Sequence, residues 1–297
     1  MKSNKFLSVV LISFAMLILA SCDDDRECPA LVPSPTSVEF GTGVFTFSHD
    51  TVISVEDQQQ KDVADWFAWL FARPAGFVPE VRMDAEDADV VLGYDSTIAP
   101  EAYKMNVTRK HIHIYASDLS GFLYAFQTLR QALPDSIGNA SHSDGQVWAV
   151  PVMTVYDAPR YMHRCLKLDM TYNHIPLEEV MTFVEYMAML KLNHLHLFGH
   201  DRYSAEEIYM LENHASAFNV NVVCGDGMSC PLYSCPDDIV SRIFPSIAAL
   251  AEVAWSDREV IDRMGFNRAV DAMDVYLSQS VLGYSKSVYD IGLAALR

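Results

Sequence analysis

The first half of the chain alternates two kinds of hydrophobic pattern. Residues 59–72 and 120–133 repeat apolar side chains at helical spacing, which predicts two amphipathic helices. Residues 31–48, 87–95 and 101–117 show the alternation or the short apolar runs typical of strands, with a turn predicted at Arg109 and Lys110. Interleaved helices and strands of this kind predict a small α+β domain over residues 30–150.

A more regular rhythm follows in residues 151–297. Strands are predicted to begin near residues 164, 194 and 219, with helices at 176–191 and 204–217 between them. Ser204 and Glu207 have the spacing of a capping box, which marks the start of the second helix. Each unit of one strand and one helix takes about 25 to 30 residues, the size of a βαβ unit, so the strands should be parallel.

The length of this second region limits the architecture. Turn-forming residues fill 224–238, and further helices are predicted only at 243–255 and 266–278. A complete eightfold barrel takes ~250 residues and at least ~200, whereas Val155 to Arg297 supplies 143. The expected fold is therefore α/β: a small α+β domain followed by an incomplete (β/α) barrel.

Composition and charge exclude some classes of function. The chain is 51% hydrophobic and 20% charged, which is typical of a globular protein with a real core. Its formal charge of −18 argues against nucleic acid as a partner, because little basic surface is available to displace counterions from phosphates. No motif points to a cofactor.

The amino-terminal segment predicts export. Lys2 and Lys5 precede an apolar run from Phe6 to Leu19, which is too short for a typical spanning helix. The run closes on Leu-Ala-Ser-Cys, which resembles the bacterial lipobox and implies a signal peptide at 1–21 and lipidation of Cys22. Residues 22–29 would be an acidic spacer, and the protein an exported lipoprotein of the outer membrane or cell surface. The alternative is an ordinary signal peptide.

The cysteines and histidines raise the questions of disulfide pairing and metal binding. Bridges among Cys224, Cys230 and Cys235 remain open, because sequence alone does not fix a pairing. His194 and His196 share one face of a strand, as in some metal-dependent hydrolases, but no later histidine or aspartate set completes their coordination. The sequence therefore predicts no metal site.

Several longer motifs carry a family resemblance. Residues 155–170 (VYDAPRYMHRCLKLDM), 187–201 (MAMLKLNHLHLFGHD) and 242–256 (RIFPSIAALAEVAWS) resemble the catalytic domain of glycoside hydrolase family 20, the β-N-acetylhexosaminidases. Residues 101–107 and 121–133 resemble the small domain that precedes that barrel. The resemblance implies partners that contain N-acetylhexosamine. It also implies substrate-assisted retaining hydrolysis, in which the 2-acetamido oxygen attacks the anomeric carbon.

The resemblance also shows what the chain lacks. In the family a glutamic acid protonates the leaving oxygen, and the aspartate just before it orients the acetamide. No aspartate of this chain is directly followed by glutamate. Strands four to seven and the catalytic pair are expected to be missing together, so the chain is predicted to be catalytically inactive. The alternatives are a non-catalytic glycan-binding protein, a partner subunit that self-associates through exposed sheet edges, or a degraded gene product.

Two residues carry the predicted substrate contacts. Arg164 matches an arginine to which the resemblance gives hydrogen bonds with sugar hydroxyls, and the alternative is an arginine paired at a barrel strand. Asp201 matches the family's first acidic residue after the second strand, which supports the catalytic acid. Phe198 and the sequence after Asp201 depart from the family pattern, so the predicted pocket has fewer hydrogen-bonding groups.

Overall fold

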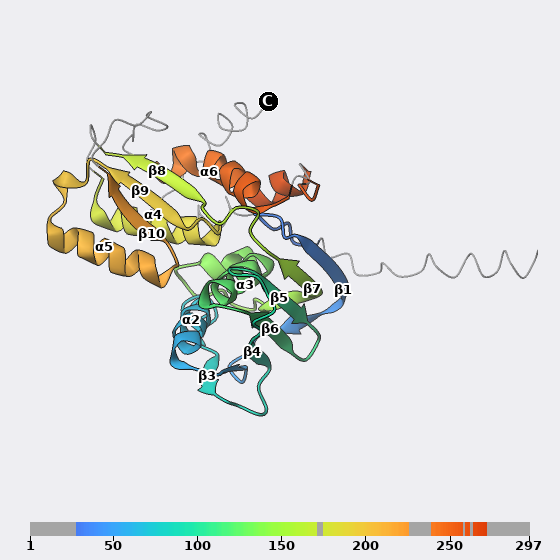
Figure 1. Ribbon diagram of the computed structural model, residues 1–297. Coiled ribbons are helices and arrows are strands. Elements are labelled where there is room, and N and C mark those ends of the chain that lie inside the picture. Colours follow the sequence, from blue (N-terminus) through green and yellow to red (C-terminus); the bar gives the residue numbers. More distant parts are fainter. Residues whose placement is uncertain (1–27, 171–174, 226–238, 258, 262–263, 272–297) are drawn as a thin grey trace, which may run out of the picture.

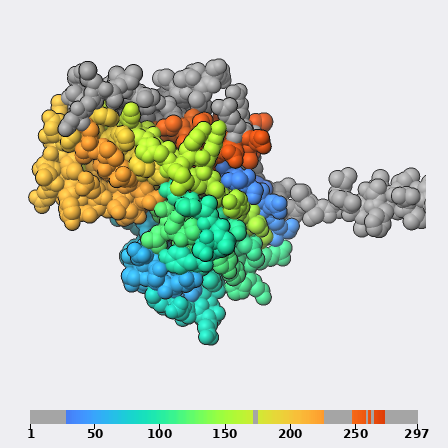
Figure 2. Space-filling view, viewed as in Figure 1, coloured from blue at the N-terminus to red at the C-terminus, as the bar shows by residue number. Residues whose placement is uncertain are grey.

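The described residues form two sheets, one from each half of the chain (Figure 1). The computed structural model describes residues 28–170, 175–225, 239–257, 259–261 and 264–271. The first sheet has seven strands and the second has three. In the space-filling view the amino-terminal lobe (blue to green) lies below the lobe of the second sheet (yellow to orange) (Figure 2).

The first sheet is mixed, with the strand order β1-β7-β5-β6-β4-β2-β3. The long strands β1 (Ser37–Thr46) and β7 (Ala149–Asp157) pair antiparallel, and β7 also pairs antiparallel with β5 (Tyr103–Val107). The other strands are β2 (Val52–Val55), β3 (Glu80–Met83), β4 (Val90–Tyr94) and β6 (Ile112–Ala116). Because all of β7 pairs within this sheet, the sheet extends past the expected domain limit at residue 150, to Asp157.

Two helices cover this sheet: α2 (Gln58–Trp69) and α3 (Leu119–Ala132). Asp57 and Asp118 cap them by accepting hydrogen bonds from backbone amides of the first turn, at 2.8 and 2.9 Å. The apolar stripes predicted from sequence face the sheet, where Phe67 and Phe126 stack with their ring centroids 4.5 Å apart.

The second sheet consists of three parallel strands, in the order β10-β9-β8. These are β8 (Cys165–Asp169), β9 (His194–Phe198) and β10 (Asn221–Gly225), joined by α4 (Leu177–Met189) and α5 (Ala205–Ala217). In β8 and β9 the leucines are buried and the alternate residues are half-buried. The leucines belong to a core that includes α4 and α5, and the other face of the sheet carries the polar side chains.

Helices α4 and α5 end in the same way. The residues just past their caps, Lys191 and Asn219, have φ of 58° and 56°. Leu192 N donates to Met187 O, and Val220 N to Ala215 O, which completes a Schellman motif at each end. Glycine is usual at this left-handed position, so a lysine and an asparagine need another reason to stand there.

Helix α6 (Ile239–Trp255) lies beside the second sheet and reaches the first. Ala248 and Ala251 pack in the core of the second sheet, whereas Trp255 packs in the core of the first. Ser34 N, from the segment before β1, donates to the Glu252 carboxylate at 2.9 Å. The helix therefore holds the two lobes together.

The expected fold class is confirmed. Within the described residues the second sheet is open, and β8 and β10 each have one edge without a neighbouring strand. The predicted capping box is present, since Glu207 N donates to Ser204 Oγ at 3.2 Å and Ser204 N to Glu207 Oε2 at 2.8 Å. None of the helices in the described parts is both long and apolar enough to cross a bilayer.

Candidate functional site

The two residues predicted to bind substrate lie at opposite ends of the parallel strands of the second sheet. Asp201 is exposed in a short helical turn, η2 (His200–Arg202), just past the carboxyl end of β9. Gly199, with φ of 72°, makes the turn out of the strand. Arg164 precedes β8, at the amino edge. Because β8 and β9 are parallel and in register, the sheet does not bring Arg164 and Asp201 together.

Arg164 is enclosed by protein acceptors. It is 1% exposed, and its Nε donates to Lys191 O at 2.7 Å. One terminal nitrogen lies 2.7 Å from the Glu101 carboxylate and donates to Tyr161 O at 2.8 Å, and the other donates to Tyr124 Oη at 3.0 Å. These contacts describe an arginine paired at a barrel strand, the alternative that the sequence left open. Sugar binding by Arg164 stays a prediction.

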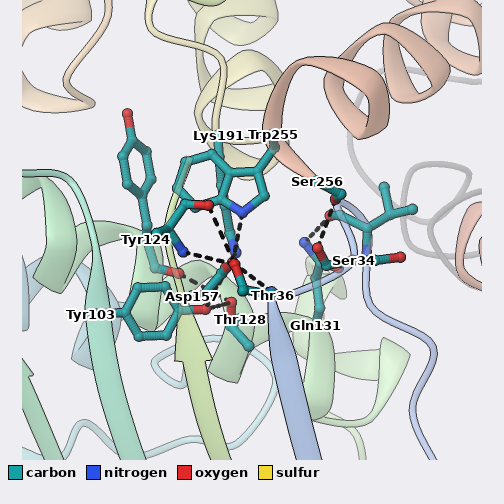
Figure 3. A network of polar contacts seen from close by, with 12 residues as sticks. Ser34, Thr36, Tyr103, Tyr124, Thr128, Gln131, Asp157, Lys191, Trp255 and Ser256 are labelled. Carbon is teal, nitrogen blue, oxygen red and sulfur yellow. Dashed lines mark hydrogen bonds and ion pairs between the residues drawn. The ribbon is translucent and has the colours of Figure 1, made fainter. Parts of the chain in front are cut away.

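A buried polar network next to Arg164 centres on Asp157, the last residue of β7 (Figure 3). One carboxylate oxygen of Asp157 accepts from Trp255 Nε1 at 2.8 Å, and the other lies 2.7 Å from Lys191 Nζ. Tyr103 Oη donates to Asp157 at 3.0 Å. Burial lowers the pKa of Lys191, and the Asp157 carboxylate opposes that shift. These side chains come from β5, β7, α6 and the end of α4, so the network joins both lobes.

The two residues in the left-handed conformation, just past the ends of α4 and α5, both contact the first lobe. Lys191 supplies the cation for Asp157, and Asn219 Nδ2 donates to Tyr124 Oη at 2.8 Å. Both ends thus place a side chain against the first lobe, which accounts for residues other than glycine there.

The face of the second sheet away from the helices carries a polar cluster. Cys165 of β8 lies beside His194 of β9, and Lys167 lies beside His196, all half-buried. The ring of the exposed His163 lies 3.9 Å from that of His194, centroid to centroid. Burial, and then His163, lowers the pKa of both His194 and His196, and burial raises the pKa of Cys165. In a closed barrel this face would line the interior.

A cavity of about 430 Å³ opens at the amino edge of the same sheet. Its lining is largely polar and includes residues of both lobes, among them Glu101, Asn193, His194, Glu212, Asn219 and Asn221. Asn193 fixes one wall, because its Nδ2 donates to Glu101 at 3.0 Å and its Oδ1 accepts from Arg164 N at 2.9 Å. In barrel enzymes the catalytic residues lie at the carboxyl ends of the strands, and the amino ends contribute to stability. This cavity lies at the amino ends, away from the position of a barrel active site.

Sequence reasoning missed Glu101, Asp157 and Lys191 as partners across the lobes. No local pattern marks them, since they lie far apart along the chain. The strand alternation could have indicated one pairing: Cys165 and His196 fall on the same polar face once β8 and β9 are set in register.

Comparisons with known proteins agree with this architecture. Residues 28–158 match the family model described as "Glycosyl hydrolase family 20, domain 2", and residues 161–206 match its "catalytic domain". The chain belongs to glycosyl hydrolase family 20. Its match to the catalytic domain covers β8, α4 and β9 and ends early in α5.

The similar curated proteins of family 20 are longer. A "Beta-hexosaminidase" of Vibrio furnissii is 30% identical over 172 residues, which is 58% of this chain and 26% of that protein. A "Beta-N-acetylhexosaminidase" of Cellulomonas fimi is 30% identical over 174 residues, or 57% of this chain and 34% of the relative. The chain thus spans about a quarter to a third of these relatives.

Solved family 20 structures share the fold. The β-N-acetylhexosaminidase of Streptomyces coelicolor A3(2) superimposes with a TM-score of 0.61 at 24% identity, covering 66% of this chain and 46% of that one. The Streptomyces plicatus N-acetyl-β-hexosaminidase gives 0.62 at 23% identity, covering 69% and 47%. These likenesses concern the fold.

Some predicted features lie outside the described residues. The signal peptide, the lipidation site Cys22, and Cys230 and Cys235 fall there, so the export and disulfide predictions stay predictions. Cys28 and Cys165 are free thiols.

Proposed function

We propose that this chain is a β-N-acetylhexosaminidase-like protein that recognises N-acetylhexosamine-containing glycans and does not hydrolyse them. The observation that carries the proposal is the absence of any Asp-Glu pair from the printed sequence of a family 20 protein. The open three-stranded sheet supports it, because the described strands supply only one wall of a sugar pocket.

The chemistry explains why the pair matters. A positioned general acid contributes about 10²- to 10⁴-fold to the rate, because it neutralises the leaving oxygen as the bond breaks. Without the orienting aspartate, the acetamide oxygen loses its alignment with the anomeric carbon. Asp201 remains at the carboxyl edge, where the barrel architecture places ligands, and can hydrogen-bond a sugar hydroxyl.

The test uses purified mature protein and a chromogenic N-acetylglucosaminide. We expect no turnover above background, and weak binding of N-acetylglucosamine oligosaccharides that Asp201→Asn reduces. Glu206→Gln is the matched control, because Glu206 is an exposed carboxylate on the neighbouring helix. Hydrolysis that Asp201→Asn abolishes and Glu206→Gln leaves intact would show an active enzyme and overturn the proposal.

We also propose that the protein is exported and anchored through Cys22. The support is the basic head, the apolar run and the Leu-Ala-Ser-Cys sequence before the acidic spacer. The wild type should sediment with membranes, and Cys22→Ala should move it to the soluble fraction. An unchanged distribution would count against the anchor.

Self-association through the second sheet is a further proposal. Within the described part of the chain, β8 and β10 each offer an unpaired edge, and such edges attract other strands. Equilibrium sedimentation should detect a dimer, and a stable monomer at all concentrations would contradict it.

A further inference from the structure

Three metal-binding side chains meet on the polar face of the second sheet. A ring nitrogen of His163, Sγ of Cys165 and a ring nitrogen of His196 all lie within 4.8 Å of one another. The sheet explains the meeting. Cys165 pairs with His194, so His196 is its diagonal neighbour on the same face, and His163 comes from the segment just before β8.

We propose that His163, Cys165 and His196 bind a zinc ion, with a fourth position open to water. A thiolate with imidazoles is a ligand set that suits zinc, and three protein ligands with one open position is a recurrent zinc arrangement. On binding, the Cys165 thiol would release its proton to solvent, and each histidine would offer a ring nitrogen lone pair. This site is independent of the proposed glycan recognition.

The geometry needs only a small adjustment. Zinc–nitrogen bonds of about 2.0–2.1 Å and zinc–sulfur bonds of about 2.3 Å imply ligand separations of roughly 3.3–3.7 Å in a tetrahedron. Ligand atoms that lie within 4.8 Å of one another would therefore have to approach by up to about 1.5 Å. His163 is exposed, so its side chain is free to change rotamer, although its ring contact with His194 would change.

The surroundings support ligation by these three residues. Cys165 is a free thiol, and its hydrogen bond to the carbonyl of Leu166 is long at 3.4 Å. His194 is already engaged, because its Nδ1 lies 2.7 Å from Asn193 Oδ1, so it borders the site. Lys167 lies beside His196, and its positive charge would repel a bound cation. Its long side chain can turn toward solvent, which reduces this repulsion. The net charge of −18 favours cations near the protein as a whole.

The sequence predicted no metal site because no suitable ligands follow His194 and His196 along the chain. The structure supplies the missing ligands from earlier in the chain. His163 and Cys165 lie about 30 residues before the histidine pair, and the parallel pairing of β8 and β9 brings them together.

The test is a zinc titration of the full mature chain, kept reduced and stripped of metal, in competition with a chromogenic chelator. We expect one equivalent to bind. Loss of a group that merely supports a metal ligand costs about 10- to 100-fold in affinity. His163→Asn, Cys165→Ser and His196→Asn should therefore each weaken binding by at least that factor. Cobalt(II) should give a thiolate charge-transfer band that is absent from Cys165→Ser.

Two control variants isolate the site. Cys28→Ser removes a free cysteine elsewhere, and His214→Asn removes a histidine on α5, so both should bind zinc as the wild type does. His163→Asn changes an exposed side chain and should fold normally, which separates lost ligation from lost structure. No stoichiometric binding by the wild type, or undiminished binding by Cys165→Ser, would overturn the proposal.

Discussion

Lys191 Nζ lies 2.7 Å from Asp157 Oδ2, and neither side chain is more than 1% exposed. Lys191 directly follows the cap of α4 in the second lobe, and Asp157 is the last residue of β7 in the first. A non-glycine residue in the left-handed region costs about 1–2 kcal/mol. At Lys191 this conformational cost is offset, because the ammonium group neutralises the buried Asp157 carboxylate.

Lys191→Met should destabilise the protein by about 3–5 kcal/mol, because it leaves the Asp157 carboxylate buried without its cation. Methionine keeps a similar length and the same left-handed penalty, so the loss reports the ion pair. The measurement is the free energy of unfolding in urea.

The control for this prediction is Lys61→Met. Lys61 forms an equally short pair with Asp65, 2.7 Å, but at the surface of α2. Exposed pairs contribute about 0–1 kcal/mol. Similar losses in the two variants would show that burial does not distinguish the pairs.

Arg164→Lys should cost about 2–5 kcal/mol, although it conserves the charge. The guanidinium uses all three nitrogens on separate acceptors, and a lysine ammonium cannot reach them all from one atom. Each buried group left without a partner costs about 1–3 kcal/mol. Thermal and urea unfolding of the purified variant measure the loss.

Arg109→Lys provides the comparison, because Arg109 is exposed and its Nε donates a hydrogen bond to Thr42 O at 3.1 Å. It should change stability by less than about 0.5 kcal/mol. Should Arg164→Lys prove as mild but abolish glycan binding, Arg164 would be a ligand residue and its structural role secondary.

The sequence predicted the elements whose hydrophobic pattern is strong. The stripe of α3 and the short apolar run of β9 identified both elements to within a few residues. It missed β2 and β3, because a four-residue strand is too short to show a period.

The candidate site was harder to predict. Arg164 and Asp201 both match family motifs, yet motif order does not say which edge of a sheet a residue occupies. The links between Asp157, Lys191 and Trp255 depend on tertiary contacts that no local pattern encodes.

Glu252→Gln should change how stability depends on pH. Burial raises the pKa of Glu252 above its ordinary value of 4.5, and the backbone amide of Ser34 opposes the shift only in part. The folded state therefore holds this proton at a pH where the unfolded chain has lost it. The resulting stabilisation is complete below pH 4.5 and is lost as the pH rises through the folded-state pKa.

Unfolding free energies of the wild type and Glu252→Gln, measured from pH 4 to 7, test this sign. The wild type should lose stability relative to the variant as the pH rises, because glutamine cannot ionise but can still accept from Ser34 N. A wild type that gains relative to the variant would mean that Ser34 and Lys191 stabilise the carboxylate more than burial penalises it.

Gly121→Ala should destabilise the first lobe by at least about 2 kcal/mol, even though alanine favours helices by about 1 kcal/mol. A methyl group at Gly121 would lie 2.5 Å from the backbone oxygen of Ala102 and 2.7 Å from Ala116 Cβ. Neither neighbour can rotate away, so α3 would have to move off β5 and β6. Ser120→Ala, one residue earlier on the same helix, should stay within about 0.5 kcal/mol. Equal stabilities of the two variants in urea would contradict the close packing of α3 on the sheet.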